Sequence, residues 1–310
     1  MRLFLTPSQT FNGEDAIIPG IFWLSNVHEM LSFICVAESD MLQGIGPGEE
    51  NAVRPFDWSD YERLVSVVKH DLDSLEYNIY HTWMSETKKK LTKMVIPALV
   101  ESQSLPGFIA SDGGGRLFNR VFNSSSQPAF SMDDILNLLN KVWKSLKSYY
   151  MEESVVQQVV TELLKLIGVT SFNDLLMRRN FSSWKRGRFL SGFLCPPHVF
   201  LTVLVIAMQI QYNITRIEEW CKSHDMPEGT LQLEHLMQAT KLLQLKKVGY
   251  LLKVAGRVSS LKYSQATAED IEIIYDVCWM LSPMQIQRMC TNYYVADYEV
   301  CLVHEIASGT

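Results

Sequence analysis

The sequence lacks the motifs of the common enzyme classes. Its 310 residues contain no GxSxG nucleophile turn, no HExxH zinc motif, no GxGxxG dinucleotide loop and no GxxxxGK phosphate loop. Asp71 and Asp73 form a DxD spacing, which is common in proteins and by itself a weak signal. We therefore predict no catalytic residue and no cofactor.

Metal-binding and disulfide patterns are also missing. The six cysteines are scattered without a CxxC pair, and the seven histidines are dispersed along the chain. A disulfide framework or a structural zinc site needs clustered ligands at short spacing. We therefore predict no metal site and expect the cysteines to be reduced thiols in a protein core.

An excess of positive charge and a long apolar run are absent as well. The net charge of −6 argues against a nucleic-acid partner. The most apolar run, residues 193–210, is interrupted by two prolines and a histidine and falls short of the ~20 residues of a membrane span. No signal-peptide pattern is found in the leading MRLFLTPSQ. We expect a cytoplasmic protein without direct membrane insertion.

Helical periodicity is what the sequence has in abundance. Apolar residues recur at three- and four-residue spacing in four segments. The spacing predicts a buried helix over 14–37, a long helix from Asp57 almost to 101, a helix that begins after Ser131 with Asp133 and Asp134 in its first turn, and a helix over 155–167 that Gly168 ends. The fold class is therefore all-α.

A segment rich in glycine and serine divides the chain. Residues 102–127 contain four glycines and a run of three serines, a composition typical of linkers. We predict a first helical subdomain over 10–110, a linker over 111–130 and a second helical subdomain over 131–299.

Several runs resemble one known family. These runs are LLMRRNFSSWKR (175–186), MQIQYNITRIEEW (208–220), LMQATKLLQLKK (236–247) and IFWLSN (21–26). They resemble the dilute domain, the cargo-binding globular tail of class V myosins, in its fungal form. The resemblance implies an elongated pair of helical bundles that binds organelle adaptor proteins through the first subdomain and Rab GTPases on vesicles through the second. It implies a non-catalytic link between these cargoes and actin-based transport, at vesicles and sites of polarised growth.

A polar stripe on the long helix is the candidate adaptor site. Asp71, Leu75, Asn78 and His81 follow one another at i, i+4, i+7 and i+10, which places them on one side of a helix. The surrounding DLDSLEYNIYHTW resembles the helix that fungal class V tails use for organelle adaptors, although the family usually has a small polar residue at the position of His81. An ordinary boundary stripe without partner is the alternative.

The resemblance also implies a Rab-binding site. It falls on Met208 and Tyr212 in MQIQY and on Lys241 and Gln244 in KLLQ. Each pair has a spacing that shares a helix face. For Tyr212 a half-buried core aromatic is the alternative. We assign Trp184, Trp220 and Trp279 to the core.

Two segments and the end of the chain depart from the family pattern. Residues 187–206 and 248–265 interrupt it, and residues 300–310 follow its last matching run as a non-homologous tail. The residues at these breaks are compatible with intron borders, so we hypothesise retained introns in a fragment whose second subdomain is incomplete. Lineage-specific loops are the alternative.

Two binding functions remain open. The chain is either the tail of a class V myosin, with the motor and coiled coil of the same protein as further partners, or a motorless dilute-domain adaptor or scaffold. A motor or a heptad segment upstream in the genome would favour the first.

Overall fold

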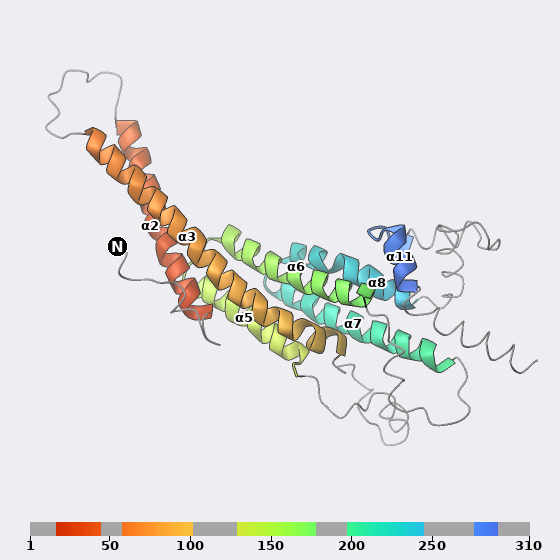
Figure 1. Ribbon diagram of the computed structural model, residues 1–310. Coiled ribbons are helices and arrows are strands. Elements are labelled where there is room, and N and C mark those ends of the chain that lie inside the picture. The colour runs from red at the N-terminus through yellow and green to blue at the C-terminus, as the bar shows by residue number, and fades with distance from the viewer. Residues whose placement is uncertain (1–16, 45–57, 102–128, 178–196, 245–275, 291–310) are drawn as a thin grey trace, which may run out of the picture. The chain divides into compact units, whose positions relative to one another are not determined.

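The computed structural model describes residues 17–44, 58–101, 129–177, 197–244 and 276–290 (Figure 1). Within these ranges the chain forms helices and turns and has no β-strand, so the predicted all-α fold is confirmed. The helices are α2 (Ile17–Gly44), α3 (Trp58–Val95), η1 (Ile96–Glu101), α5 (Met132–Ser148), α6 (Glu153–Met177), α7 (Pro197–Ser223), η3 (Pro227–Leu233), α8 (Glu234–Gln244) and α11 (Pro283–Cys290).

The chain divides into two compact units. The first combines Met1–Lys90 with Leu138–Gln158, and the second combines Leu91–Asn137 with Val159–Thr310. Helices α3, α5 and α6 therefore contribute residues to both units. The subdomain boundaries expected from the sequence stay a prediction. The expected linker over 111–130 lies almost wholly outside the described residues and stays a prediction.

In the first unit, α2 buries only one of its faces. Ile21, Leu24 and Val27 are buried, as are the inward residues of α3, whereas Phe33 is 65% exposed and Val36 is 59% exposed. The prediction of a buried helix over 14–37 is therefore only half right. Apolar periodicity gives the helix, but it does not tell how many sides of the helix find a partner.

The turn between α5 and α6 in the first unit contains a strained residue. Tyr150 has φ 57°, in the left-handed region that glycine usually occupies. The amides of Tyr150 and Met151 donate to the carbonyls of Lys147 and Leu146, which is the hydrogen-bond pattern that ends many helices. Ser25 Oγ of α2 donates to the carbonyl of Tyr149 at 2.7 Å and fixes the turn.

In the second unit, α5 begins where the sequence predicts. The backbone amide and hydroxyl of Ser131 donate to the Asp134 carboxylate at 2.7 and 2.8 Å, and Ser131 Oγ accepts from the Asp134 amide at 3.3 Å. These hydrogen bonds lower the pKa of Asp134. The reciprocal pairing satisfies amides that the first turn of the helix leaves open.

Gly168 does not end a helix, so that prediction is wrong. Helix α6 continues through it to Met177. A Cβ atom at Gly168 would lie 2.3 Å from the carbonyl oxygen of Gln232 in η3, far inside van der Waals contact. The glycine is therefore needed for the close approach of η3 and not for a helix cap.

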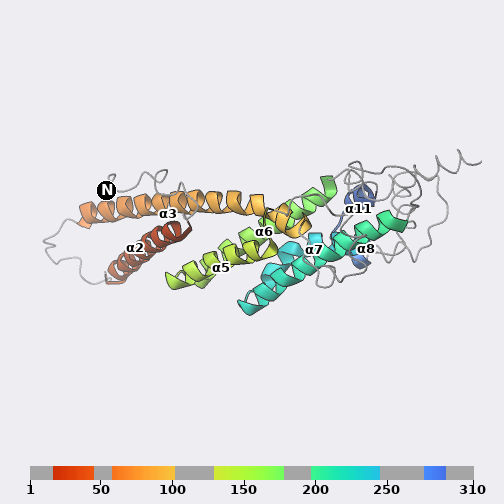
Figure 2. The same ribbon diagram turned by 90° about the horizontal axis from the view of Figure 1, so that it is seen from below.

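Helix α7 is the central element of the second unit. It packs against α8, η3 and η1, and α7 and α8 lie side by side in both views (Figure 1 and Figure 2). Ile210, Ile214 and Ile217 on α7 are fully buried. Trp220 is buried as predicted, whereas Trp279 is 68% exposed and its assignment to the core is wrong. Its neighbours Cys278 and Leu281 are the buried residues of that turn. The third tryptophan assigned to the core, Trp184, lies outside the described residues.

The segments that depart from the family pattern are described only in part. Residues 197–206 continue α7 without a break, with Pro197 in the first turn, where its missing amide donor costs little. Residues 187–196, 248–265 and 300–310 lie outside the described residues, so the retained-intron hypothesis stays a prediction.

Two helices are long and apolar enough to cross a membrane, Ile17–Ser39 and Glu153–Met177, by length and composition alone. The core helices of water-soluble proteins pass the same criterion. Half of the most apolar stretch in the second helix is buried inside the protein. These two helices therefore do not by themselves indicate membrane insertion.

Candidate functional site

The predicted adaptor residues lie on the surface of the first unit. Asp71, Asn78 and His81 on α3 are exposed and Leu75 is half-buried. Leu72, Ile79 and Trp83, which are offset around the same helix, are buried. The inward and outward faces of α3 are thus clearly separated, and the three residues Asp71, Leu75 and Asn78, called here the α3 stripe, lie outside the core.

His81 differs from the other three. Its ring packs on Tyr77 at a centroid distance of 4.1 Å and lies edge-on to Tyr80 at 5.6 Å. Tyr77 itself is 63% exposed. The structure therefore places His81 in an aromatic cluster at the margin of the α3 stripe. His81 is also the residue at which this sequence departs from the family pattern.

Two polar pairs tie α3 to α2 behind this surface. His28 Nδ1 of α2 lies 2.7 Å from Glu76 Oε1 of α3. Lys69 Nζ donates to Glu38 Oε2 at 2.6 Å, and this hydrogen bond raises the pKa of Lys69. The two pairs lie along the helix and fix the orientation in which α3 presents its outer face.

The predicted Rab-binding residues lie on α7 and α8 in the second unit. Met208 is 39% exposed, Lys241 is exposed, and Tyr212 and Gln244 are half-buried. We call these four residues the α7–α8 surface. Its two helices pack directly on each other, so the structure brings the two predicted pairs onto neighbouring elements.

Part of the α7–α8 surface takes part in the packing itself. Gln244 Nε2 donates to Gln211 Oε1 at 2.5 Å and joins the two helices. Cys278 is buried, which raises the pKa of its thiol to about 12, while the positive charge of Lys241 opposes the shift. Gln244 therefore holds α8 to α7, a role that the sequence did not indicate.

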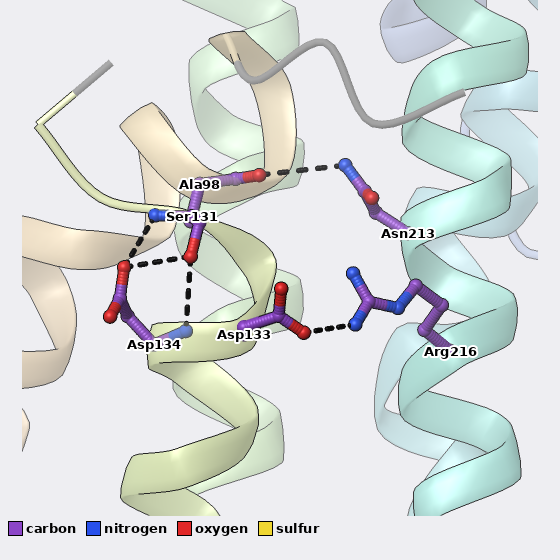
Figure 3. A network of polar contacts seen from close by, with 6 residues as sticks. All are labelled: Ala98, Ser131, Asp133, Asp134, Asn213 and Arg216. Carbon is purple, nitrogen blue, oxygen red and sulfur yellow. Dashed lines mark hydrogen bonds and ion pairs between the residues drawn. The ribbon is translucent and has the colours of Figure 1, made fainter. Parts of the chain in front are cut away.

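A polar network on the other side of α7 was missed by the sequence analysis. Asn213 Nδ2 donates to the carbonyl of Leu99 at 3.0 Å. It also lies 3.5 Å from the carbonyl of Ala98, and both carbonyls belong to η1 (Figure 3 shows the contact with Ala98). Arg216, one turn further on, pairs with Asp133 at the start of α5 (Figure 3). Asn213 thus gives the backbone of η1 a side-chain hydrogen-bond donor from α7.

The signal for this network was present in the sequence. Asn213 is fully buried, between Ile210, Ile214 and Ile217 on an apolar face. A polar residue on such a face needs a hydrogen-bond partner inside the protein.

Ionisable groups do not gather into a reactive centre in the part of the chain that the structure describes. Those residues contain no group of three or more His, Cys, Asp or Glu side chains that could hold a metal ion. Cys221 and Cys278 are buried free thiols. Burial raises the pKa of Cys221 to about 11, so it stays protonated and unreactive at neutral pH.

The comparisons with known proteins agree with this arrangement. Residues 204–297, which include α8 and most of α7, match the model of the DIL domain family. Myosin-2 of Lachancea kluyveri is 42% identical over 95% of this chain, and Myosin-2 of Saccharomyces cerevisiae is 38% identical over 95% of it. The chain belongs to the DIL domain family. The dilute-domain resemblance expected from the sequence is thereby confirmed.

Solved structures extend this DIL domain assignment to the fold. The structure of Myo2-GTD in complex with Mmr1 matches this chain with a TM-score of 0.65 and 32% sequence identity. The match covers 96% of this chain and 64% of the Myo2-GTD chain. A myosin V cargo binding domain has a TM-score of 0.64. The chain is homologous to the cargo-binding globular tail of class V myosins. It spans about 16% of the length of the curated relatives it matches.

Proposed function

We propose that this chain is a non-catalytic cargo-binding domain that links organelle adaptors and Rab-bearing vesicles to actin-based transport in the cytoplasm. The α3 stripe takes the adaptor and the α7–α8 surface takes the Rab GTPase. The observation that carries the proposal is the homology to the globular tail of class V myosins. Similar domains have been solved in complex with Mmr1, Smy1 and Inp2.

The exposure of the α3 stripe supports its role as the adaptor site. Asp71 and Asn78 are exposed on an ordered helix, and Leu75 offers a half-buried apolar group between them. Interfaces take most of their binding energy from a few such anchors, surrounded by polar contacts. The stripe is thus suited to a short adaptor segment.

A charge reversal on α3 tests the adaptor site. We expect Asp71→Lys to abolish binding of a purified Mmr1 fragment in isothermal titration calorimetry and to leave the melting temperature unchanged, because surface substitutions alter stability by only about 0.5 kcal/mol. Asp73→Lys is the matched control, since Asp73 is also exposed but lies two residues away, on the opposite side of the helix.

Equal loss of binding in both variants would show that the overall charge of α3 matters and not the stripe. A large drop in melting temperature with Asp71→Lys would assign the stripe to the core.

The Rab role of the α7–α8 surface rests on the family resemblance and on the exposure of Met208 and Lys241. We expect Tyr212→Ala to weaken binding of GTP-loaded Rab proteins by about 2 kcal/mol, the size of an interface hot spot, without affecting adaptor binding. Lys241→Ala tests the exposed part of the same surface. Lys222→Ala, which removes another exposed lysine of the second unit, serves as its control. Loss of both activities with Tyr212→Ala would indicate misfolding.

A further inference from the structure

Two large apolar side chains lie exposed on α3 next to the α3 stripe. Leu64 is 59% exposed and Val67 is 52% exposed. Val67 precedes Asp71 by four residues and Leu64 precedes it by seven, so both point to the same side of the helix as Asp71. Leu64, Val67, Asp71, Leu75 and Asn78 thus form one continuous row.

The row has the spacing of a helix–helix contact. Its members are three, four, four and three residues apart, the interval at which one helix packs along another. From Leu64 to Asn78 the helix rises about 21 Å. Three members of the row, Leu64, Val67 and Leu75, are apolar and the other two are polar, so the row would bury apolar side chains and still keep a specific polar register.

The charges around the row select the partner. Asp71 is the one charged residue in it, and among the described residues it forms no ion pair. Other acidic residues of this part of α2 and α3 do not face the row: Asp73 lies on the opposite side of α3, and Glu76 and Glu38 are paired with His28 and Lys69. The carboxylate of Asp71 is therefore the charge that the row offers to a partner, and it attracts a basic side chain.

We propose that the adaptor site extends two helical turns beyond the α3 stripe to Leu64 and Val67, and that its ligand is a basic amphipathic helix of the adaptor. The ligand places apolar residues at three- and four-residue spacing on Leu64, Val67 and Leu75 and a Lys or Arg against Asp71. This inference rests on the proposed function and specifies the conformation and chemistry of the adaptor segment. The binding mode is that of an amphipathic helix laid along an apolar row.

The exposed apolar residues of α2 provide the control for the experiment. Val36 is 59% exposed, close to Val67 in exposure and identical in side chain, but it lies on a different helix. With the Mmr1 fragment as ligand, we expect Val67→Ser to weaken binding about tenfold, the effect of one apolar anchor. Val36→Ser should leave the affinity unchanged, and the two variants should melt at the same temperature.

The basic residue of the ligand is identified by charge reversal. We expect one Lys→Glu or Arg→Glu substitution in the fragment to restore binding to the Asp71→Lys chain. Restoration by no single substitution would overturn the assigned pairing with Asp71. Circular dichroism of the fragment should show a gain of helix on binding to the unsubstituted chain, and an extended bound fragment would overturn the helical ligand.

Other results separate this inference from the proposed function. Full affinity of Val67→Ser together with loss of binding by Asp71→Lys would overturn the extension and leave the adaptor site in place. No binding by the unsubstituted chain would count against the proposed function itself. A lower melting temperature of Val67→Ser than of Val36→Ser would show that the chain covers this face itself. Binding to phosphatidylserine vesicles that Val67→Ser removes would assign the row to a lipid surface.

Discussion

The two candidate surfaces differ in how far they are built into the fold. Asp71 and Asn78 of the α3 stripe are exposed and point away from the buried face of α3. On the α7–α8 surface, Tyr212 is half-buried and Gln244 is hydrogen-bonded to Gln211. The residue after Tyr212, Asn213, is fully buried.

Because of this difference, substitutions on the α3 stripe should affect binding alone, whereas substitutions on the α7–α8 surface should affect both binding and the free energy of unfolding. On a helix face whose side chains have no role in packing, a substitution changes what the protein binds and leaves its free energy of unfolding almost untouched. On a surface whose residues also join two helices, one substitution changes both. The following predictions test how sharp this distinction is.

The largest contrast is expected between two asparagines. Asn213→Asp places a carboxylate against the carbonyl oxygens of Ala98 and Leu99, where the amide now donates. The lost hydrogen bonds and the buried charge should lower the free energy of unfolding by about 3 kcal/mol or more. Asn78→Asp makes the same change on the α3 stripe and should cost less than about 0.5 kcal/mol.

Urea denaturation of both variants measures this contrast. Similar costs for the two substitutions would break the distinction between the surfaces. The cost at Asn213 should shrink at low pH, because a protonated carboxyl is uncharged and can again donate a hydrogen bond to these carbonyls.

A smaller effect, of opposite sign, is expected at the turn of the first unit. Tyr150→Gly removes a side chain from a left-handed backbone conformation and should raise the free energy of unfolding by about 1 kcal/mol. Asp225, at the end of α7 in the second unit, has the same φ of 57° and the same pattern of turn hydrogen bonds. Aspartate tolerates this conformation better, so Asp225→Gly should gain less. Thermal unfolding compares the two variants. Tyr150 is 95% exposed and has little packing to lose, so a loss of stability with Tyr150→Gly would contradict the prediction.

The smallest effect at neutral pH concerns the thiols. Burial raises the pKa of Cys221 to about 11 and that of Cys278 to about 12, so the folded state holds both protons more tightly than the unfolded chain. Their contribution to stability is therefore complete below about pH 9, the range of an ordinary thiol, and is lost as the pH rises toward 11.

Thiol alkylation checks this prediction in a chain whose Cys195, Cys290 and Cys301 are replaced by alanine. At pH 8 the half-buried Cys35 should react first, while Cys221 and Cys278 react only on unfolding. Rapid alkylation of Cys221 in the folded protein would show that the second unit opens locally.

The sequence was most reliable where the pattern is local. The start of α5 at Ser131 follows from residues within three positions of one another. The candidate surfaces came from family resemblance, and their exposure on α3, α7 and α8 was compatible with that prediction. The partner roles of their residues stay predictions.

By itself, the sequence determined the helices, the position of a helix cap and membership of the DIL domain family, because periodicity, capping chemistry and sequence identity are properties of neighbouring or matched residues. Only the tertiary structure decided that Gly168 serves the contact with Gln232, that Asn213 pairs with η1 and that Trp279 stays outside the core. Asn213 and Leu99 are 114 residues apart, and a local pattern has no information about which distant backbone atom a side chain will meet. Packing makes that choice, since every buried polar group must find its partner in three dimensions.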